Sequence, residues 1–314
     1  MCGIVGYIGE EQAAPILLDG LSKLEYRGYD SAGIAVYNNG EIKAAKAMGR
    51  LKVLDALTQG GQTLPGRAGI GHTRWATHGV PSNTNAHPHF NKDESIAVVH
   101  NGIIENFMKL KKLLESKGYT FVSDTDSEVV AHLLDYYYKG DPLEAITRMM
   151  HRVEGSYALG ILFKDHPDQV YAARKDCPLI AGKGETGNFV ASDVPAILHH
   201  TRTVYFIENE EIVQLTADAL HFYNIDGEEI EKESTEITWD LEAAEKGGYD
   251  HFLLKEIYEQ PKAVADTLNP RIKDDQIVIE ELGMSDEEIR AIRKIFIVAC
   301  GSASYTGMTA KYIF

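Results

Sequence analysis

Hydrophobic and polar positions along the chain predict short strands interleaved with amphipathic helices. Cys2–Gly9 and Ser31–Tyr37 are apolar runs typical of strands, and Asn38-Asn39-Gly40 predicts a turn into a further strand at Glu41–Ala47. The stretch between the first two strands has apolar residues at helical spacing, namely Ile16, Leu17, Leu21 and Leu24.

Two more apolar runs, Ala68–His72 and Ile96–His100, predict buried strands. Each delivers polar residues at its C-terminal end, in His72-Thr73-Arg74-Trp75 and His100-Asn101-Gly102. A helix from about Ile103 to Lys117 is expected to follow the second run.

Thr125-Asp126-Ser127-Glu128 has the pattern of a capping box ahead of a helix at Val129–Tyr138. Asp126 would then lie in the first helical turn. A further helix is expected near Pro142–Val153, and the segment Gly155–Tyr223 predicts five or six short strands. Because strands and helices fall in separate runs, the sequence predicts an α+β fold.

The pattern changes after an acidic stretch that ends in Lys246-Gly247-Gly248. We expect a linker over 239–250, which divides a first domain at 1–238 from a second at 251–314. In the second, helices are predicted at His251–Leu268 and Ser285–Arg293, and a buried strand at Lys294–Ala299 feeds a small-residue turn and another helix. A parallel strand needs a long crossover before its partner, so the second domain is expected to be incomplete.

Composition narrows the possible functions. The 314 residues are 44% hydrophobic and 25% charged, as in globular proteins, and their net charge of −16 argues against a nucleic-acid or anionic-membrane partner. No apolar run reaches the roughly 18 residues of a membrane span. Cys2, Cys177 and Cys300 lie too far apart for a CxxC metal site, and their odd number fits a reducing compartment. We expect a cytoplasmic protein.

Cys2 is the first candidate for chemistry. Removal of Met1 would leave a residue that carries both a thiol, with an ordinary pKa of about 8.5, and an α-amine that titrates at about 7.7–8.0. Nucleophile and general base would then share one residue. The alternative is that a small second residue merely permits Met1 removal.

Three other segments offer groups that suit an amide substrate. Arg74 has a planar fork for a carboxylate, and Trp75 can cover a ligand, although both also fit an ordinary loop. Asn101-Gly102 could donate two hydrogen bonds to an oxyanion, or be a turn. Asp126 could pair with an ammonium group, or complement the helix dipole.

Two further clusters have weaker chemical indications. His87, His89 and His100 lack helical spacing and nearby cysteines, which favours hydrogen-bonding roles over a metal site. Backbone N–H groups and hydroxyls at Cys300-Gly301-Ser302-Ala303-Ser304 suit a phosphate, although a helix N-cap has the same pattern.

Together these segments resemble the glutamine amidotransferases with an N-terminal nucleophile, and most closely the glucosamine-6-phosphate synthase family. The matching segments run through the whole chain in order: Cys2–Gly6, Leu24–Gly33, His72–Gly79, Val99–Asn106, Ser123–Glu128, Lys255–Pro261 and Cys300–Gly307. The resemblance implies a four-layer αββα sandwich followed by the truncated start of an α/β phosphosugar-isomerase domain.

The resemblance also implies roles for the site residues. Cys2 would attack the amide carbon of L-glutamine while its α-amine shuttles the proton, with the Asn101 side chain and the Gly102 N–H as oxyanion donors. Arg74 would hold the α-carboxylate and Asp126 the α-ammonium. Residues expected to line or close the pocket are Trp75, Thr77, His78 and Gly79, and Arg27 is expected near the nucleophile. No cofactor or metal is implied.

In this family the released ammonia travels to fructose 6-phosphate, in a second half that also carries the dimer interface. This chain would hold only the first strand-turn of the sugar site. Ser302 and Ser304 are the candidates for sugar-phosphate contacts, but the sequence of this turn departs from the family pattern: many relatives read Cys-Gly-Thr, whereas Ser302-Ala303-Ser304-Tyr305 shifts the hydroxyls. We expect this chain to hydrolyse glutamine without making glucosamine 6-phosphate, and the full-length enzyme to be a homodimer.

Other functions stay open at the level of sequence. Another amidotransferase of this class, which makes phosphoribosylamine or asparagine, would share the Cys2 chemistry, but Lys255–Pro261 and the Cys300 turn argue against it. An acylase would not need Arg74 and Asp126. A phosphosugar-binding regulator would use the first domain only as a structural element.

Overall fold

The computed structural model describes residues 2–238, 248–273, 276–279 and 282–313. The chain divides into two compact units, Met1–Glu245 and Lys246–Phe314. Each unit is described by itself. Most of the linker predicted at 239–250 lies outside the described residues.

The first unit contains an eight-stranded antiparallel sheet in the order β15-β11-β9-β10-β1-β4-β2-β3. Its strands are β1 (Gly3–Gly9), β2 (Ser31–Asn38), β3 (Glu41–Met48), β4 (Ala68–Arg74), β9 (Ile180–Lys183), β10 (Gly187–Ala191), β11 (Thr203–Phe206) and β15 (Thr235–Glu236). Helices α1 (Ala13–Leu24) and α2 (Leu51–Thr58) cover its outer face, and short 3-10 turns occur at Glu25–Arg27 and Val194–Ala196.

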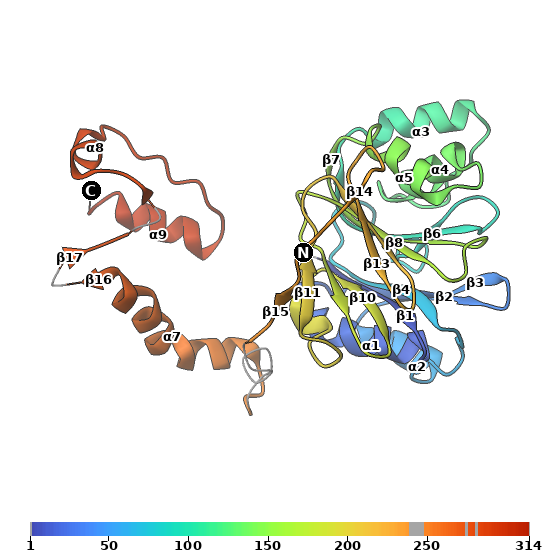
Figure 1. Cartoon of the computed structure of the whole chain (residues 1–314), viewed down its shortest axis with the longest axis horizontal. Coiled ribbons are helices and arrows are strands. Elements are labelled where there is room, and N and C mark those ends of the chain that lie inside the picture. Colours follow the sequence, from blue (N-terminus) through green and yellow to red (C-terminus); the bar gives the residue numbers. More distant parts are fainter. Residues whose placement is uncertain (1, 239–247, 274–275, 280–281, 314) are drawn as a thin grey trace. The chain divides into compact units, whose positions relative to one another are not determined.

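A seven-stranded sheet, in the order β14-β13-β12-β8-β7-β6-β5, forms the second half of this unit. Its strands are β5 (His89–Phe90), β6 (Ile96–Ile104), β7 (Gly155–Phe163), β8 (Val170–Lys175), β12 (Glu211–Leu215), β13 (Leu220–Tyr223) and β14 (Glu229–Ile230). Helices α3 (Phe107–Ser116), α4 (Glu128–Tyr137) and α5 (Pro142–Met150) cover its outer face. In Figure 1, α1 and α2 lie below the strands and α3, α4 and α5 above them.

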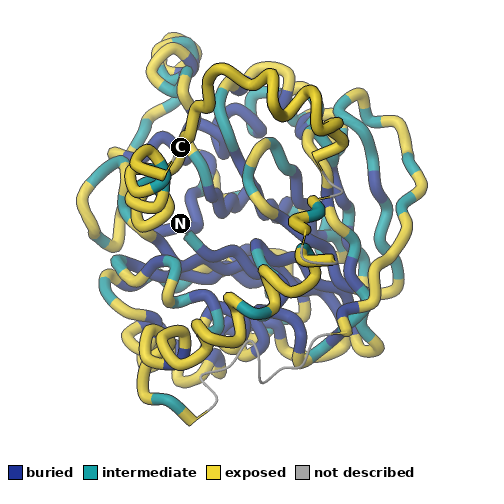
Figure 2. Tube along the Cα trace, turned by 90° about the vertical axis from the view of Figure 1, so that its left-hand side faces the viewer, coloured by how far each residue is buried: buried dark blue, intermediate teal, exposed yellow. Residues whose placement is uncertain are grey.

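Three buried clusters show that these elements form four layers. One lies between α1, α2 and the first sheet, one between the two sheets, and one between the second sheet and α3, α4 and α5. Neighbouring residues alternate between clusters: Val98 on β6 packs toward the helices and Val99 toward the other sheet. The central strands are therefore buried on both faces, and their residues are dark blue in Figure 2. The predicted αββα sandwich is confirmed.

The predicted boundary after Ile96–His100 is wrong. β6 continues to Ile104, because Ile103 and Ile104 pair with Ser156 and Gly155 on β7, and α3 begins only at Phe107. Asn101-Gly102 thus lies inside a strand and does not open a helix. The Gly155–Tyr223 segment contains seven strands among its described residues, where five or six were expected.

The predicted capping box is also wrong. Helix α4 begins at Glu128 with Ser127 as its N-cap, and Asp126 precedes the helix. The Thr125 hydroxyl contacts His89 Nε2 at 3.1 Å, and the Glu128 carboxylate accepts hydrogen bonds from Val122 and Ser123. Tertiary partners have replaced the reciprocal pair that local sequence favours.

The second unit contains α7 (Phe252–Leu268), α8 (Asp286–Ala291), α9 (Ser302–Ala310), a 3-10 turn at Asn269–Arg271, and a β16 (Ile272–Lys273) and β17 (Gln276–Ile277) hairpin. The buried strand predicted at Lys294–Ala299 is not formed, and Val298 is 95% exposed. A strand needs backbone partners, and within the described part of this unit β16 and β17 pair only with each other. Among the described residues of the whole chain, no helix has the length and apolar character needed to cross a bilayer.

Candidate active site

Cys2 lies directly before β1 and against the end of β4. Gly3 pairs with Thr73, and the Cys2 sulfur accepts a hydrogen bond from the Trp75 backbone N–H at 3.2 Å. Burial raises the pKa of the Cys2 thiol, although the contact with Trp75 opposes that shift. The protonated thiol therefore predominates near neutral pH, so a base must accept its proton during attack.

The Cys2 side chain opens into a cavity of about 290 Å³ between the two sheets' ends. Its lining residues are Cys2, Arg27, Trp75, Thr77, Asn101, Gly102, Ile103, Ser156, Cys177 and Pro178. The predicted nucleophile, both predicted oxyanion donors and three of the other predicted residues thus meet in one cavity. Its volume is suited to a small substrate.

Asn101 is held in one orientation by His72. The Asn101 Nδ2 donates to the Cys2 carbonyl at 3.1 Å, while His72 Nε2 lies 3.0 Å from both the Asn101 Oδ1 and the His100 carbonyl. Burial lowers the pKa of His72 to about 3, so the ring is neutral. Because both neighbours of Nε2 are acceptors, Nε2 carries the hydrogen, and the amide N–H group faces Cys2. Sequence reasoning missed this role of His72.

Two glycines allow close backbone approaches that shape the site. Gly102 has φ +130°, and a Cβ there would lie 2.0 Å from the Ser156 carbonyl oxygen. A Cβ at Gly28 would lie 2.7 Å from the Trp75 backbone nitrogen. Gly28 therefore lets the turn that carries Arg27 pack against Trp75. In the sequence, the only sign of this role is a glycine that follows an arginine.

Arg74 is buried at the end of β4, where it pins the following loop. Its Nη2 donates to the His78 carbonyl and, at 3.1 Å, to the Gly79 carbonyl. Its Nη1 is buried and has no hydrogen-bond partner among the described residues. Burial lowers the pKa of Arg74, and the thiolate form of Cys2 and the Asp126 carboxylate oppose this shift. The guanidinium therefore lies within electrostatic reach of both predicted neighbours.

Asp126 is also buried, with 4% exposure. Its Oδ2 accepts a hydrogen bond from the Ile104 N–H at 2.8 Å, two residues beyond Gly102 on β6. The Ser127 hydroxyl lies 3.5 Å from Oδ1 and 2.8 Å from His100 Nδ1. Asp126 and Arg74 are thus both tied to the strand ends that carry the nucleophile and the oxyanion donors.

Some of the remaining predicted residues line the Cys2 cavity and others lie outside its lining. Among those that line it, Trp75 is 45% exposed and meets the Tyr29 ring edge-on at 5.6 Å, and Arg27 forms an ion pair with Asp193. His78 packs edge-on against Phe107 at 5.7 Å. Predicted residues that do not line the cavity among the described residues are Arg74, His78, Gly79 and Asp126.

The histidines between β4 and β6 make hydrogen bonds and ring contacts. His87 Nδ1 accepts from the His100 N–H at 3.2 Å, and the rings of His72 and His87 stack at 4.1 Å. In the second unit, Ser302 and Ser304 lie in the first turn of α9, and the Ser304 hydroxyl donates to the Gly301 carbonyl at 2.7 Å. The predicted sugar-phosphate role of these serines stays a prediction.

Comparison with known proteins connects this geometry with a chemistry. Residues 72–199 match the family described as "Glutamine amidotransferase domain". Over the whole chain, identity is 57% to glutamine–fructose-6-phosphate aminotransferase [isomerizing] of Caldanaerobacter subterraneus and 56% to that of Clostridium acetobutylicum. The corresponding protein of Thermus thermophilus is 48% identical. The chain covers 52% of the first two relatives and 51% of the third, so it spans about half their length.

Solved structures agree on the fold. The glutamine phosphoribosylpyrophosphate amidotransferase of B. subtilis, complexed with ADP and GMP, has a TM-score of 0.60 and 26% identity, covering 76% of this chain and 50% of that one. A glutamine aminotransferase class-II domain protein from Silicibacter pomeroyi, at 17% identity and a TM-score of 0.52, shares the fold over 71% of this chain and 99% of its own. The predicted resemblance is confirmed: the chain is similar throughout to glutamine–fructose-6-phosphate aminotransferases, and its residues 72–199 match the glutamine amidotransferase domain.

Proposed function

We propose that the first unit hydrolyses L-glutamine to glutamate and ammonia through a γ-glutamyl thioester on Cys2. One observation carries the proposal: the Cys2 thiol, the Asn101 amide and Gly102 line one cavity, and His72 fixes the amide so that its N–H groups face Cys2. A carbonyl carbon placed at the sulfur would have its oxygen beside these donors.

The chemical steps follow from the groups present. In the form whose first residue is Cys2, the α-amine takes the thiol proton as the sulfur bonds to the amide carbon. Asn101 Nδ2 and the Gly102 N–H stabilise the resulting oxyanion. The C–N bond then breaks, and the α-amine returns the proton to the leaving ammonia. Water attacks the thioester next, which releases glutamate and restores the thiol.

Arg74 and Asp126 would select glutamine over other amides. The Nη1 of Arg74, which has no hydrogen-bond partner among the described residues, would bind the substrate α-carboxylate, and the Asp126 carboxylate would bind the α-ammonium. Both side chains are buried, so an unpaired charge in this site would be costly and a substrate lacking either group would bind poorly.

In the full-length protein we propose that the ammonia converts fructose 6-phosphate to glucosamine 6-phosphate, as the names of the relatives indicate. The second unit would contribute the start of the sugar site, with Ser302 and Ser304 as candidate contacts. A homodimer is our prediction for the full-length protein. We propose the cytoplasm as its compartment, because the three cysteines are free thiols and Cys2 must stay reduced to react.

An assay of the purified chain tests the proposal. We expect incubation with glutamine and fructose 6-phosphate to form glutamate and ammonia but no glucosamine 6-phosphate. Intact-mass measurement of the same sample identifies the fraction with Cys2 at the N-terminus, which should account for the activity. Absence of glutamate from that fraction would contradict the proposal, as would appreciable aminosugar.

The likeness to glutamine phosphoribosylpyrophosphate amidotransferase supports a second candidate, in which the ammonia goes to an activated pentose. The first unit would catalyse the same hydrolysis in either case. Supplying different ammonia acceptors to the full-length protein separates the two candidates, since only one acceptor should yield an aminated product.

A further inference from the structure

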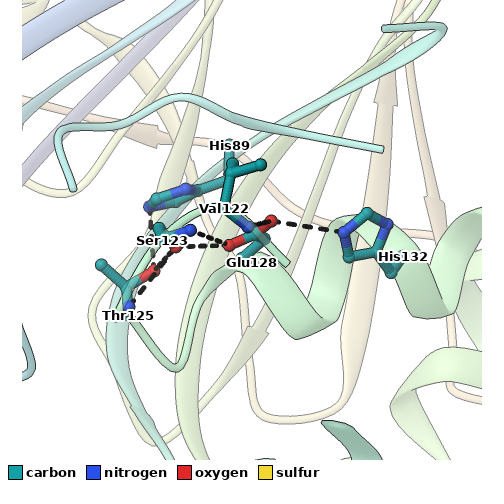
Figure 3. Close-up of polar contacts among 6 residues, drawn as sticks. All are labelled: His89, Val122, Ser123, Thr125, Glu128 and His132. Atoms are coloured by element: carbon teal, nitrogen blue, oxygen red, sulfur yellow. Dashed lines mark hydrogen bonds and ion pairs between the residues drawn. The ribbon is translucent and has the colours of Figure 1, made fainter. Parts of the chain in front are cut away.

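A buried polar network surrounds Glu128, the first residue of α4, away from the Cys2 cavity. Glu128 is 1% exposed, yet its carboxylate is fully engaged. It accepts from the Val122 N–H at 2.8 Å, the Ser123 N–H at 2.7 Å and the Ser123 hydroxyl at 2.6 Å, and lies 3.3 Å from His132 Nε2. Figure 3 shows these side chains together with His89 and Thr125.

The hydrogen bonds in this network outweigh the cost of burying a charge. Burial alone would raise the pKa of the Glu128 carboxyl, but hydrogen bonds from His132, Ser123 and Val122 lower it to about 2. Glu128 is therefore a carboxylate at neutral pH. Three of its contacts come from Val122 and Ser123, and they fix the segment that precedes the helix.

That segment leads directly to Asp126. The Ser123 hydroxyl also contacts the Thr125 hydroxyl at 3.0 Å, and Thr125 contacts His89 Nε2 at 3.1 Å. Asp126 follows Thr125 and precedes Glu128 by two residues, so its backbone is anchored on both sides. Its own carboxylate is fixed at the other end by the Ile104 N–H.

We propose that Glu128 is a positioning residue that holds the 122–126 segment so that Asp126 can receive the α-ammonium of glutamine. The inference rests on the proposed function. It assigns a task to a buried carboxylate that does not line the Cys2 cavity and borders a separate pocket. Glu128 would thereby set the preference for an α-amino acid over a plain amide.

Glu128→Gln tests this role. The substituted amide keeps the size of the side chain, but its NH2 group would face backbone N–H donors, so the segment should move. We expect KM for glutamine to rise about tenfold with kcat within about threefold, since the change affects binding rather than the reacting atoms. Inhibition by glutaramate, which has the amide and carboxylate but no α-ammonium, should keep its Ki.

Asp135→Asn is the matched control. Asp135 lies on the same helix and also accepts hydrogen bonds, from Asn91 at 2.8 Å and Tyr119 at 2.7 Å, but it holds other segments. Asp135→Asn should therefore leave the KM for glutamine unchanged. If Glu128→Gln does not fold, Ser123 provides a second test. Ser123→Ala should raise the KM for glutamine, and Ser123→Thr, which keeps the hydroxyl, should leave it near the value of the unaltered chain.

Hydrogen exchange of the Ile104 amide gives a readout that needs no activity. Displacement of Asp126 removes the acceptor of that amide, so Glu128→Gln should speed its exchange at least about tenfold while Asp135→Asn does not. If Glu128→Gln weakened the binding of glutamine and of glutaramate equally, the inference about Glu128 would be overturned. It would also be overturned if both the KM for glutamine and the Ile104 exchange rate were unchanged. Neither result would contradict the proposed glutaminase function. An unaltered chain that forms no glutamate contradicts the proposed function, while Ile104 exchange still decides whether Glu128 positions Asp126.

Discussion

The two units of the chain differ in what they do with apolar side chains. All buried apolar side chains among the described residues belong to the first unit, nearly all of them in three clusters between four layers. In the described part of the second unit, Phe296 is 76% exposed, Val298 95% and Tyr312 89%. Apolar sequence alone therefore does not make a core, because burial needs a facing layer.

Secondary structure differs between the units for the same reason. Helix α8 forms from local signals, since Ser285 and Glu288 satisfy each other's backbone N–H groups in a capping box. The apolar run at Lys294–Ala299 remains without regular structure. In the first unit, β6 forms and even lengthens because β7 pairs with it. A helix supplies its own hydrogen-bond partners, whereas a strand requires a neighbour.

The largest contrast expected between the units concerns their cysteines. Cys2→Ala should reduce glutaminase activity by at least about 1,000-fold, because it removes the sulfur that is proposed to form the thioester. Cys300→Ala, in the second unit, should leave the rate within about threefold. Measuring glutamate release by both variants, with circular dichroism to confirm folding, decides this. Comparable losses would contradict the assignment of chemistry to the first unit.

The next largest contrast is expected in the free energy of unfolding when an apolar residue of each unit is shortened to alanine. Leu159 on β7 is fully buried, so Leu159→Ala should lower the free energy of unfolding by about 3 kcal/mol. Val298→Ala, at an exposed position, should change it by less than about 0.5 kcal/mol. Urea denaturation measures both. Similar changes at the two positions would mean that Val298 is buried in solution.

Acid should destabilise the first unit through its buried histidines. The pKa of His72 is lowered to about 3 by burial, whereas an unfolded histidine titrates near 6.5. Between these values the unfolded chain binds more protons, so stability falls as pH falls. The loss at pH 5 should be about 2 kcal/mol for His72 alone. His87 and His89, whose pKa values burial also lowers, add to it.

Urea unfolding at pH 7 and pH 5, followed at the amides of β6, measures this loss. His72→Gln provides the control. It removes one titrating group, so the free energy of unfolding should depend less steeply on pH, by the equivalent of up to one bound proton. Equal stability at both pH values would show that these imidazoles take up protons in the folded state.

The smallest expected effect is that of removing the second unit. A chain shortened after Glu245 keeps all three buried clusters and every residue of the Cys2 cavity. Its kcat and KM for glutamine should stay within about twofold of those of the 314-residue chain. A loss of more than about tenfold would show that the second unit supports the glutaminase site.

The sequence anticipated much of the site but not its construction. Cys2, Arg74, Asn101-Gly102 and Asp126 were found as residue types suited to an amide substrate, and the resemblance to a family gave them roles. His72 was not found, because a buried histidine in a strand has no local signal for the amide that it orients. The Ile103-Ile104 pair after Gly102 was a sign that the strand continues.

By itself, then, the sequence determined the chemistry available to this protein and the elements whose signals are local: the Asn39-Gly40 turn, helix α1 and the Ser285 capping box. Only the tertiary structure decided where β6 ends, how Glu128 is used, and which way the Asn101 amide faces. These features depend on partners distant in sequence, such as β7, Val122 and His72. Periodicity cannot identify such partners, because both faces of the central strands are buried.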